Sequence, residues 1–288
     1  MERILALRAD SYELKEKIKG GHIGERAGLK KGENMNIEYI TCSDMREHND
    51  IDEIISLGKK YPMAEFAIQA HPSKFSQHMS RYAWFNTLAH AARVNKMNLA
   101  MHVNAEYRTE LCFGNIPYSL RRLWEIRRDD NTPVISRVQV NINGGNDKFD
   151  FYPDKVADII RAYPDIKFIF QYAPVQKKRI QRLDKQGVPF ALLYDVSGGE
   201  GKLSRDSWGG IILPGHQTGY AGGLSPDNVV ENLNYINTLL PANYDTWIDA
   251  EGKLKSPDDN GKKLFDTTLA EKYIVRAITW QMKYGYQK

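Results

Sequence analysis

From Met35 onward, short apolar runs of strand length alternate with longer segments of helical periodicity. Strands that alternate with helices along a chain indicate repeated βα units and a parallel sheet. We count about eight such runs, the number that a closed (β/α)8 barrel requires. The pattern therefore predicts an α/β protein with the TIM-barrel fold. Its strands are expected at residues 37–41, 65–70, 98–103, 137–141, 167–172, 190–194, 218–221 and 246–248.

The segments between these runs have the features of helices. The isoleucines of residues 50–60 fall on one helical face, and residues 152–163 repeat this pattern. Asp266 stands where a carboxylate can cap the final helix. Ser225 and Pro226 are residue types that favour a helix N-cap and the first helical position. We therefore expect a helix to begin at Ser225.

The main alternative fold is a doubly wound open sheet, which normally has a glycine-rich turn after its first strand. Here the first predicted strand is followed by Thr-Cys-Ser-Asp at 41–44, without glycine. The glycine clusters come late, after the sixth and seventh predicted strands, where barrels place phosphate loops. This position favours the barrel.

Residues 1–34 differ from the rest because glycines interrupt a short Leu- and Lys-rich segment. We interpret them as an N-terminal extension and residues 35–288 as one barrel domain. The chain has 288 residues, with 42% hydrophobic and 26% charged residues, which is typical of a globular protein with a large core.

The net charge of +4 comes from basic residues that are spread along the chain, so nucleic acid is not an expected partner. Two cysteines, Cys42 and Cys112, make no disulfide framework and fit a reducing compartment. No apolar run is long enough for a signal peptide or a membrane span. We expect a cytoplasmic monomer or homodimer.

Two glycine-rich loops are the first candidates for a ligand-binding site. One follows Asp195 and contains Gly198, Gly199 and Gly201. The other contains Gly222 and Gly223, before the predicted helix. Glycine lets backbone N–H groups approach an anion, and a helix N-terminus adds a positive dipole end. Either loop alone can be an ordinary turn, but two on consecutive strands predict a shared phosphate site.

The motifs in this half of the chain resemble those of the phosphoribosylanthranilate isomerases. The matching segments are Leu-Tyr-Asp at 193–195, Gly-Gly-Glu-Gly at 198–201, Asp-Ser-Trp at 206–208 and Ala-Gly-Gly-Leu-Ser-Pro-Asp-Asn-Val at 221–229. Val-Gln-Val-Asn at 138–141 and the Thr-Cys ending of the first strand are also similar to the family. The order of motifs matches from about Met35 to the C-terminus.

This resemblance implies an Amadori rearrangement of an N-phosphoribosyl amine, without a cofactor. A general acid opens the sugar ring and a general base then removes a proton from the neighbouring carbon. The resemblance assigns the acid to Asp195 and the base to Cys42. Read from the residues alone, Cys42 can equally be an inert buried thiol and Asp195 a cap for its loop.

Other polar residues near predicted strand ends suit the lining of a sugar site; they are His102, Gln139, Asn141, Gln171 and Asp249. A metal site from His102, Glu106, Asp195 and Asp249 is conceivable, but no close metal-binding motif such as HxH or HExxH supports it. We therefore predict a lining without metal.

The leading hypothesis is an isomerase for a phosphorylated sugar or phosphoribosyl-amine substrate. Two departures from the family leave other functions open: Glu200 replaces a threonine, and residues 249–252 differ from the family's eighth strand. One alternative is a protein that binds or sequesters a phosphorylated ligand without turnover. The other is a metal-assisted hydrolase or epimerase of sugar phosphates.

Overall fold

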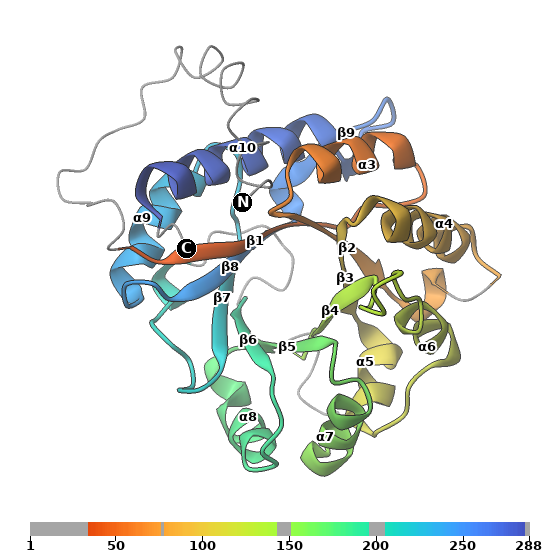
Figure 1. The fold of residues 1–288 in the computed structure, drawn as a ribbon, viewed down its shortest axis with the longest axis vertical. Coiled ribbons are helices and arrows are strands. Elements are labelled where there is room, and N and C mark those ends of the chain that lie inside the picture. The colour runs from red at the N-terminus through yellow and green to blue at the C-terminus, as the bar shows by residue number, and fades with distance from the viewer. Residues whose placement is uncertain (1–33, 76–77, 143–150, 196–204, 286–288) are drawn as a thin grey trace.

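The computed structural model describes residues 34–75, 78–142, 151–195 and 205–285. Eight parallel strands close into a barrel in chain order, with the last strand paired to the first (Figure 1). They are β1 (Asn36–Ser43), β2 (Ala64–Ala70), β3 (Asn98–Val103), β4 (Ile135–Val140), β5 (Lys167–Tyr172), β6 (Ala191–Tyr194), β7 (Gln217–Ala221) and β8 (Asp245–Ala250). The predicted (β/α)8 barrel is confirmed.

Helices cover the outside of the barrel (Figure 1). They are α3 (Ile51–Lys60), α4 (Ser80–Asn95), α5 (Ala105–Cys112), α6 (Tyr118–Trp124), α7 (Pro153–Ala162), α8 (Lys177–Asp184), α9 (Val229–Leu239) and α10 (Thr267–Tyr284). A short antiparallel hairpin, β9 (Lys255–Pro257) and β10 (Lys263–Phe265), stands between β8 and α10.

Two aspartates cap the starts of helices, and the sequence analysis predicted this role for Asp266. The Asp50 carboxylate accepts a hydrogen bond from the backbone N–H of Asp52 at the start of α3 (2.8 Å). Asp266 accepts hydrogen bonds from the N–H groups of Thr268 and Leu269 in α10 (2.8 and 3.1 Å). These bonds satisfy N–H groups that have no partner inside a helix, so each cap fixes the start of its helix.

The predicted start of α9 was wrong, because the helix begins at Val229 and not at Ser225. The Ser225 N–H donates to Asn228 Oδ1 (2.8 Å), and the Asn228 N–H donates to Ser225 Oγ (3.3 Å). These reciprocal bonds form a turn before the helix, with Asn228 at its N-cap position.

Strand alternation divides the core into two layers, because successive side chains point to opposite faces. Leu192 and Ile248 pack between the barrel and the helices in the larger apolar cluster. Their neighbours Leu193 and Trp247 belong to a separate, smaller cluster inside the barrel. The inner cluster consists of Ile169, Ala191, Leu193, Ala221 and Trp247, with Tyr39 packed against it.

Met35 is the first residue of the core and is fully buried. Asn34 Nδ2 donates to the Tyr284 carbonyl oxygen at the end of α10 (2.8 Å). The segment 1–33 lies outside the described residues, so its assignment as an extension stays a prediction.

Candidate functional site

A ring of polar side chains lines the inside of the barrel at the carboxyl ends of the strands. Every strand except β7 contributes a residue at its end, or directly after it in the case of β6, and β7 has Ala221 at this position. The ring consists of Ser43, Gln69, His102, Gln139, Gln171, Asp195 and Asp249. Barrel enzymes place their active sites at this end, because the βα loops surround it. We call these residues the mouth ring.

Asp249 is the centre of the best-defined contacts in the mouth ring. Ser43 Oγ donates a hydrogen bond to Asp249 Oδ1 (2.5 Å). On the other side, His102 Nε2 lies 3.6 Å from Asp249 Oδ2. The His102 and Asp249 side chains are only 4% and 7% exposed. A carboxyl group and an imidazole are therefore held together in a largely dehydrated place.

Burial changes the proton affinity of both groups. It raises the pKa of Asp249 well above its usual range; the hydrogen bond from Ser43 opposes this rise, and the charges of Glu251 and Asp195 add to it. Burial lowers the pKa of His102 to about 3, helped by the positive charge of Arg137. Burial therefore favours the protonated form of Asp249 and the neutral form of His102.

Asp195 lies at the end of β6, where the sequence predicted it. Its side chain accepts a hydrogen bond from Gln171 Nε2 at the end of β5 (2.7 Å). It is largely buried and close enough for its charge to raise the pKa values of both Asp249 and Glu251. The mouth thus brings two carboxyl groups, Asp195 and Asp249, into electrostatic contact.

Amide side chains continue the network across β2, β3 and β4. Asn104 Nδ2 donates to Gln69 Oε1, and Asn141 Nδ2 donates to Asn104 Oδ1 (2.7 Å). Gln139 Nε2 donates to Asn141 Oδ1 (2.8 Å), and Gln69 Nε2 donates to Glu251 Oε2 (2.8 Å). Amides that can both donate and accept suit the hydroxyl groups of a sugar. We call this row of amides the amide belt.

A compact charge cluster stands above β1 and β8. Asp44 accepts two bonds from Arg46, the shorter 2.6 Å long, and also contacts Lys255 Nζ (2.7 Å). Lys255 Nζ in turn lies 3.1 Å from Glu251 Oε1. Although burial works in the other direction, the bonds and charges of these two cations lower the pKa of Asp44. Asp44 therefore stays ionised and fixes both cations at the mouth.

Cys42, the predicted base, does not face the mouth. Its neighbours Thr41 and Ser43 bond to the interior residues Glu65 and Asp249, so alternation turns the thiol to the opposite face. There Cys42 is fully buried in the core between barrel and helices, and burial raises its pKa well above its usual range. This is the position of an inert core thiol, the other reading that the sequence allowed.

The glycine loops are described only in part. Gly198, Gly199 and Gly201 lie outside the described residues, so the predicted convergence of the two loops stays a prediction. Gly222 and Gly223 follow β7, next to the end of β6, with positive φ values of 101° and 73°. Positive φ angles of this kind favour glycine, which has no Cβ atom.

Sequence reasoning found His102, Gln139, Asn141, Gln171, Asp195 and Asp249, and all of them lie at the mouth. It missed Ser43, Gln69 and the charge cluster. One available signal was the Thr-Cys-Ser run at 41–43, in which two polar residues flank the thiol. Period-two alternation places Ser43 on the face opposite Cys42.

Within the described residues, no group of three or more His, Cys, Asp and Glu side chains is arranged to hold a metal ion. Glu106, once considered as a ligand, is exposed on α5. Among the same residues, no helix has the length and apolar character to span a membrane.

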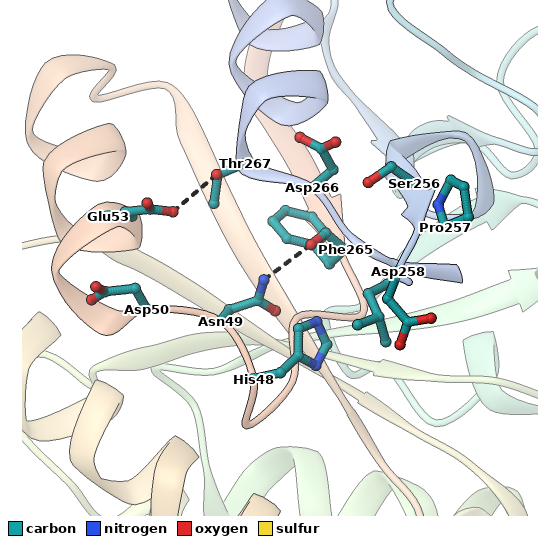
Figure 2. A pocket seen from close by; sticks show the side chains of 11 residues that line it. His48, Asn49, Asp50, Glu53, Ser256, Pro257, Asp258, Phe265, Asp266 and Thr267 are labelled. Carbon is teal, nitrogen blue, oxygen red and sulfur yellow. Dashed lines mark hydrogen bonds between the residues drawn. The ribbon is translucent and has the colours of Figure 1, made fainter. Parts of the chain in front are cut away.

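A separate hollow lies beside the mouth, between the loop after β1 and the β9–β10 hairpin (Figure 2). Its volume is about 360 Å³, and its lining includes His48, Asp50, Glu53 and Asp258. Figure 2 shows the Asn49 amide bound to the Phe265 carbonyl (3.0 Å) and Thr267 bound to Glu53 (3.0 Å). No residue of the mouth ring lines this hollow.

The eight parallel strands and their helices define a (β/α)8 barrel. Its polar mouth lies at the end of the strands where enzymes with this fold have their active sites. No protein-family model matches the sequence, and a search of curated proteins finds no significant relative. Comparisons with solved structures, by contrast, find 64 similar chains.

One similar structure is a truncated 3-deoxy-D-arabino-heptulosonate 7-phosphate synthase from Thermotoga maritima. Its TM-score is 0.53 at 11% identity, and the match covers 95% of this chain and 97% of that one. A structure described as a "putative spore coat polysaccharide biosynthesis protein E", from Chromobacterium violaceum, scores 0.51 at 11% identity, over 86% and 75% of the two chains. Phosphoribosyl anthranilate isomerase from Thermus thermophilus scores 0.47 at 11% identity, over 84% and 98%. The first two likenesses, whose TM-scores exceed 0.5, support the barrel fold alone.

Proposed function

We propose that this protein is an isomerase-type enzyme for a phosphorylated sugar or phosphoribosyl-amine substrate, and that it works by general acid and base catalysis at the mouth ring. One observation carries the proposal: two buried carboxyl groups, Asp195 and Asp249, face the same barrel interior in electrostatic contact. Paired carboxyl groups with different environments are a common way to supply one acid and one base.

We assign different roles to the two carboxyl groups. Burial raises the pKa of Asp249 and favours its protonated form, so we assign Asp249 as the acid that protonates the ring oxygen. Asp195 accepts a hydrogen bond from Gln171, which orients its carboxylate as the base that removes a carbon-bound proton. This division reverses the acid role that the family resemblance implies for Asp195, and it replaces Cys42.

The rest of the mouth supports a sugar phosphate as the substrate class. The amide belt offers donors and acceptors for hydroxyl groups. Gly222 and Gly223 follow β7 with the positive φ angles of an anion-binding turn, and phosphate sites of barrels commonly use the loops after the seventh and eighth strands.

Asp195→Asn and Asp249→Asn test these roles, because each removes a titrating group with little change in shape. We expect each substitution to lower kcat by about 10²–10⁴-fold against a panel of aldose phosphates and N-phosphoribosyl aryl amines. Cys42→Ala is the matched control and should keep its turnover. Wild-type turnover in both asparagine variants would contradict the proposal.

A second candidate is a protein that retains a phosphorylated ligand without turnover. The amide belt favours it, since amides recognise a sugar but do not transfer protons. Mass spectrometry of the purified protein distinguishes the two functions. A retained ligand that no condition converts to product would favour binding alone.

A further inference from the structure

The side chains of the amide belt all donate their hydrogen bonds in the same direction. Gln139 Nε2 donates to Asn141 Oδ1 (2.8 Å), and Asn141 Nδ2 donates to Asn104 Oδ1 (2.7 Å). Asn104 Nδ2 donates to Gln69 Oε1, and Gln69 Nε2 donates to Glu251 Oε2 (2.8 Å). Each amide thus gives an N–H group to the next residue, and the row ends on a carboxylate directly after β8.

The carboxylate at the end of the row explains this common direction. An amide can meet its neighbour with its nitrogen or with its oxygen, so a row of amides alone allows both directions. A carboxylate only accepts hydrogen bonds, so Gln69 must turn its nitrogen to Glu251 and its oxygen to Asn104. Asn104 then has to present its nitrogen to that oxygen. The same requirement passes along the row to Asn141 and Gln139.

Lys255 favours the form of Glu251 that accepts hydrogen bonds. The Lys255 Nζ atom lies 3.1 Å from Glu251 Oε1 and 2.7 Å from Asp44 Oδ2. Burial raises the pKa of Glu251, and the charge and hydrogen bond of Lys255 oppose this rise. Because Oε1 contacts the ammonium group, the other carboxylate oxygen, Oε2, is the one that Gln69 meets. The charge cluster is therefore connected directly to the amide belt.

The direction of the row determines what its other end offers to a ligand. Gln139 lies in the mouth ring on β4, and among the described residues no group donates a hydrogen bond to its Oε1 atom. An amide oxygen at this end accepts a hydrogen bond from a hydroxyl group. If the row ran in the opposite direction, the same end would present N–H groups instead.

We propose that Glu251 is a positioning residue that sets the direction of the amide belt, so that Gln139 offers its carbonyl oxygen to a hydroxyl group of the substrate. Hydrogen bonds that share a direction also polarise one another, which strengthens each of them. A longer hydrogen bond, from Asn104 Nδ2 to the His102 carbonyl oxygen (3.4 Å), favours the same direction at Asn104. The inference rests on the proposed function, because it names a group that binds the substrate.

Glu251→Gln tests the direction with little change in shape. Lys255 only donates, so the new amide should turn its oxygen to Lys255 and its nitrogen to Gln69. We expect the whole row to reverse, which changes the open end at Gln139 from an oxygen to a nitrogen. Neutron diffraction from crystals exchanged into D2O distinguishes an amide ND2 group from an oxygen. Crystals at about pH 8 favour the carboxylate in the wild-type protein.

A double variant moves the carboxylate one place along the row. Glu251→Gln combined with Gln69→Glu again gives Asn104 a neighbour that only accepts hydrogen bonds. We therefore expect the wild-type direction to return from Asn104 to Gln139. Glu47→Gln is the control, because it removes a carboxylate that is paired with Arg81 (2.9 Å), and it should leave the direction unchanged.

The orientation of Gln139 decides the outcome. The inference is supported if its nitrogen faces Asn141 in the wild-type protein and in the double variant, and its oxygen faces Asn141 in Glu251→Gln. An unchanged Gln139 in folded Glu251→Gln, or a reversed Gln139 in the double variant, overturns it. If the variants do not fold, the wild-type neutron structure still decides, since a Gln139 oxygen that faces Asn141 there would contradict the direction. The expected orientations in a protein without turnover would support the role of Glu251 and count only against the proposed activity.

Discussion

A single glycine determines how the inside of the barrel is filled. Gly219 on β7 faces Trp247, and a Cβ atom at this position would lie 2.2 Å from the indole ring. The Arg137 guanidinium also lies over this indole. Gly219 is thus required by close approach, not by an unusual backbone angle.

Gly219→Ala should therefore lower the free energy of unfolding by about 1–3 kcal/mol, the usual cost of overpacking. Urea denaturation measures this change. Gly58→Ala is the comparison: its Cβ would lie 2.8 Å from the buried Met97 side chain, which is unbranched and can shift, and alanine favours the helix α3, so its cost should be smaller. Equal costs at the two positions would argue against the tight fit to Trp247.

At the residue scale, the sequence identified most of the mouth but not the direction of every side chain. The last four residues of the first strand are all buried, on both faces of the sheet. Hydrophobicity alone therefore does not show whether Cys42 faces the barrel interior or the surrounding helices. The partners of Ser43 and Gln69 are hundreds of residues away in the chain (|i−j| of 206 and 182), and no local pattern predicts them.

At the element scale, the eight strands were predictable because each is a short apolar run between helical segments. Their ends moved by one or two residues once neighbouring strands paired, as in β8. The start of α9 was not predictable from residue types alone. Ser225 and Asn228 are both good caps, and their reciprocal bonds decide between them.

The longest helix, α10, depends on its first residue for a defined start. Asp266→Ala removes two hydrogen bonds to backbone N–H groups and should lower the free energy of unfolding by about 1 kcal/mol. Asp266→Asn retains an acceptor and should cost less. Chemical denaturation of the three proteins tests this ranking, which equal midpoints would contradict.

At the scale of the whole molecule, His102 links folding to pH. Its folded pKa of about 3 lies below the value of about 6.5 for an unfolded chain, so the unfolded state binds the extra proton between them. This group makes stability rise with pH in that window. Asp249 has the opposite sign, because its raised pKa lets the folded state hold a proton that the unfolded chain loses above about pH 4.

His102→Gln removes the first contribution and leaves the second. Relative to the variant, the wild-type protein should lose about 1.4 kcal/mol of stability per pH unit as the pH falls from about 6 to about 4. Urea denaturation at several pH values measures the difference. His90→Gln, at an exposed position on α4, is the control. Parallel curves for wild type and His102→Gln would contradict the expected linkage.

The two thiols, Cys42 in β1 and Cys112 at the end of α5, are both fully buried. A soluble alkylating reagent can meet a buried sulfur only while the surrounding structure is open. The alkylation rate of each cysteine therefore reports how often the structure around that cysteine opens. The two native thiols allow this measurement at two places in the barrel without an introduced probe.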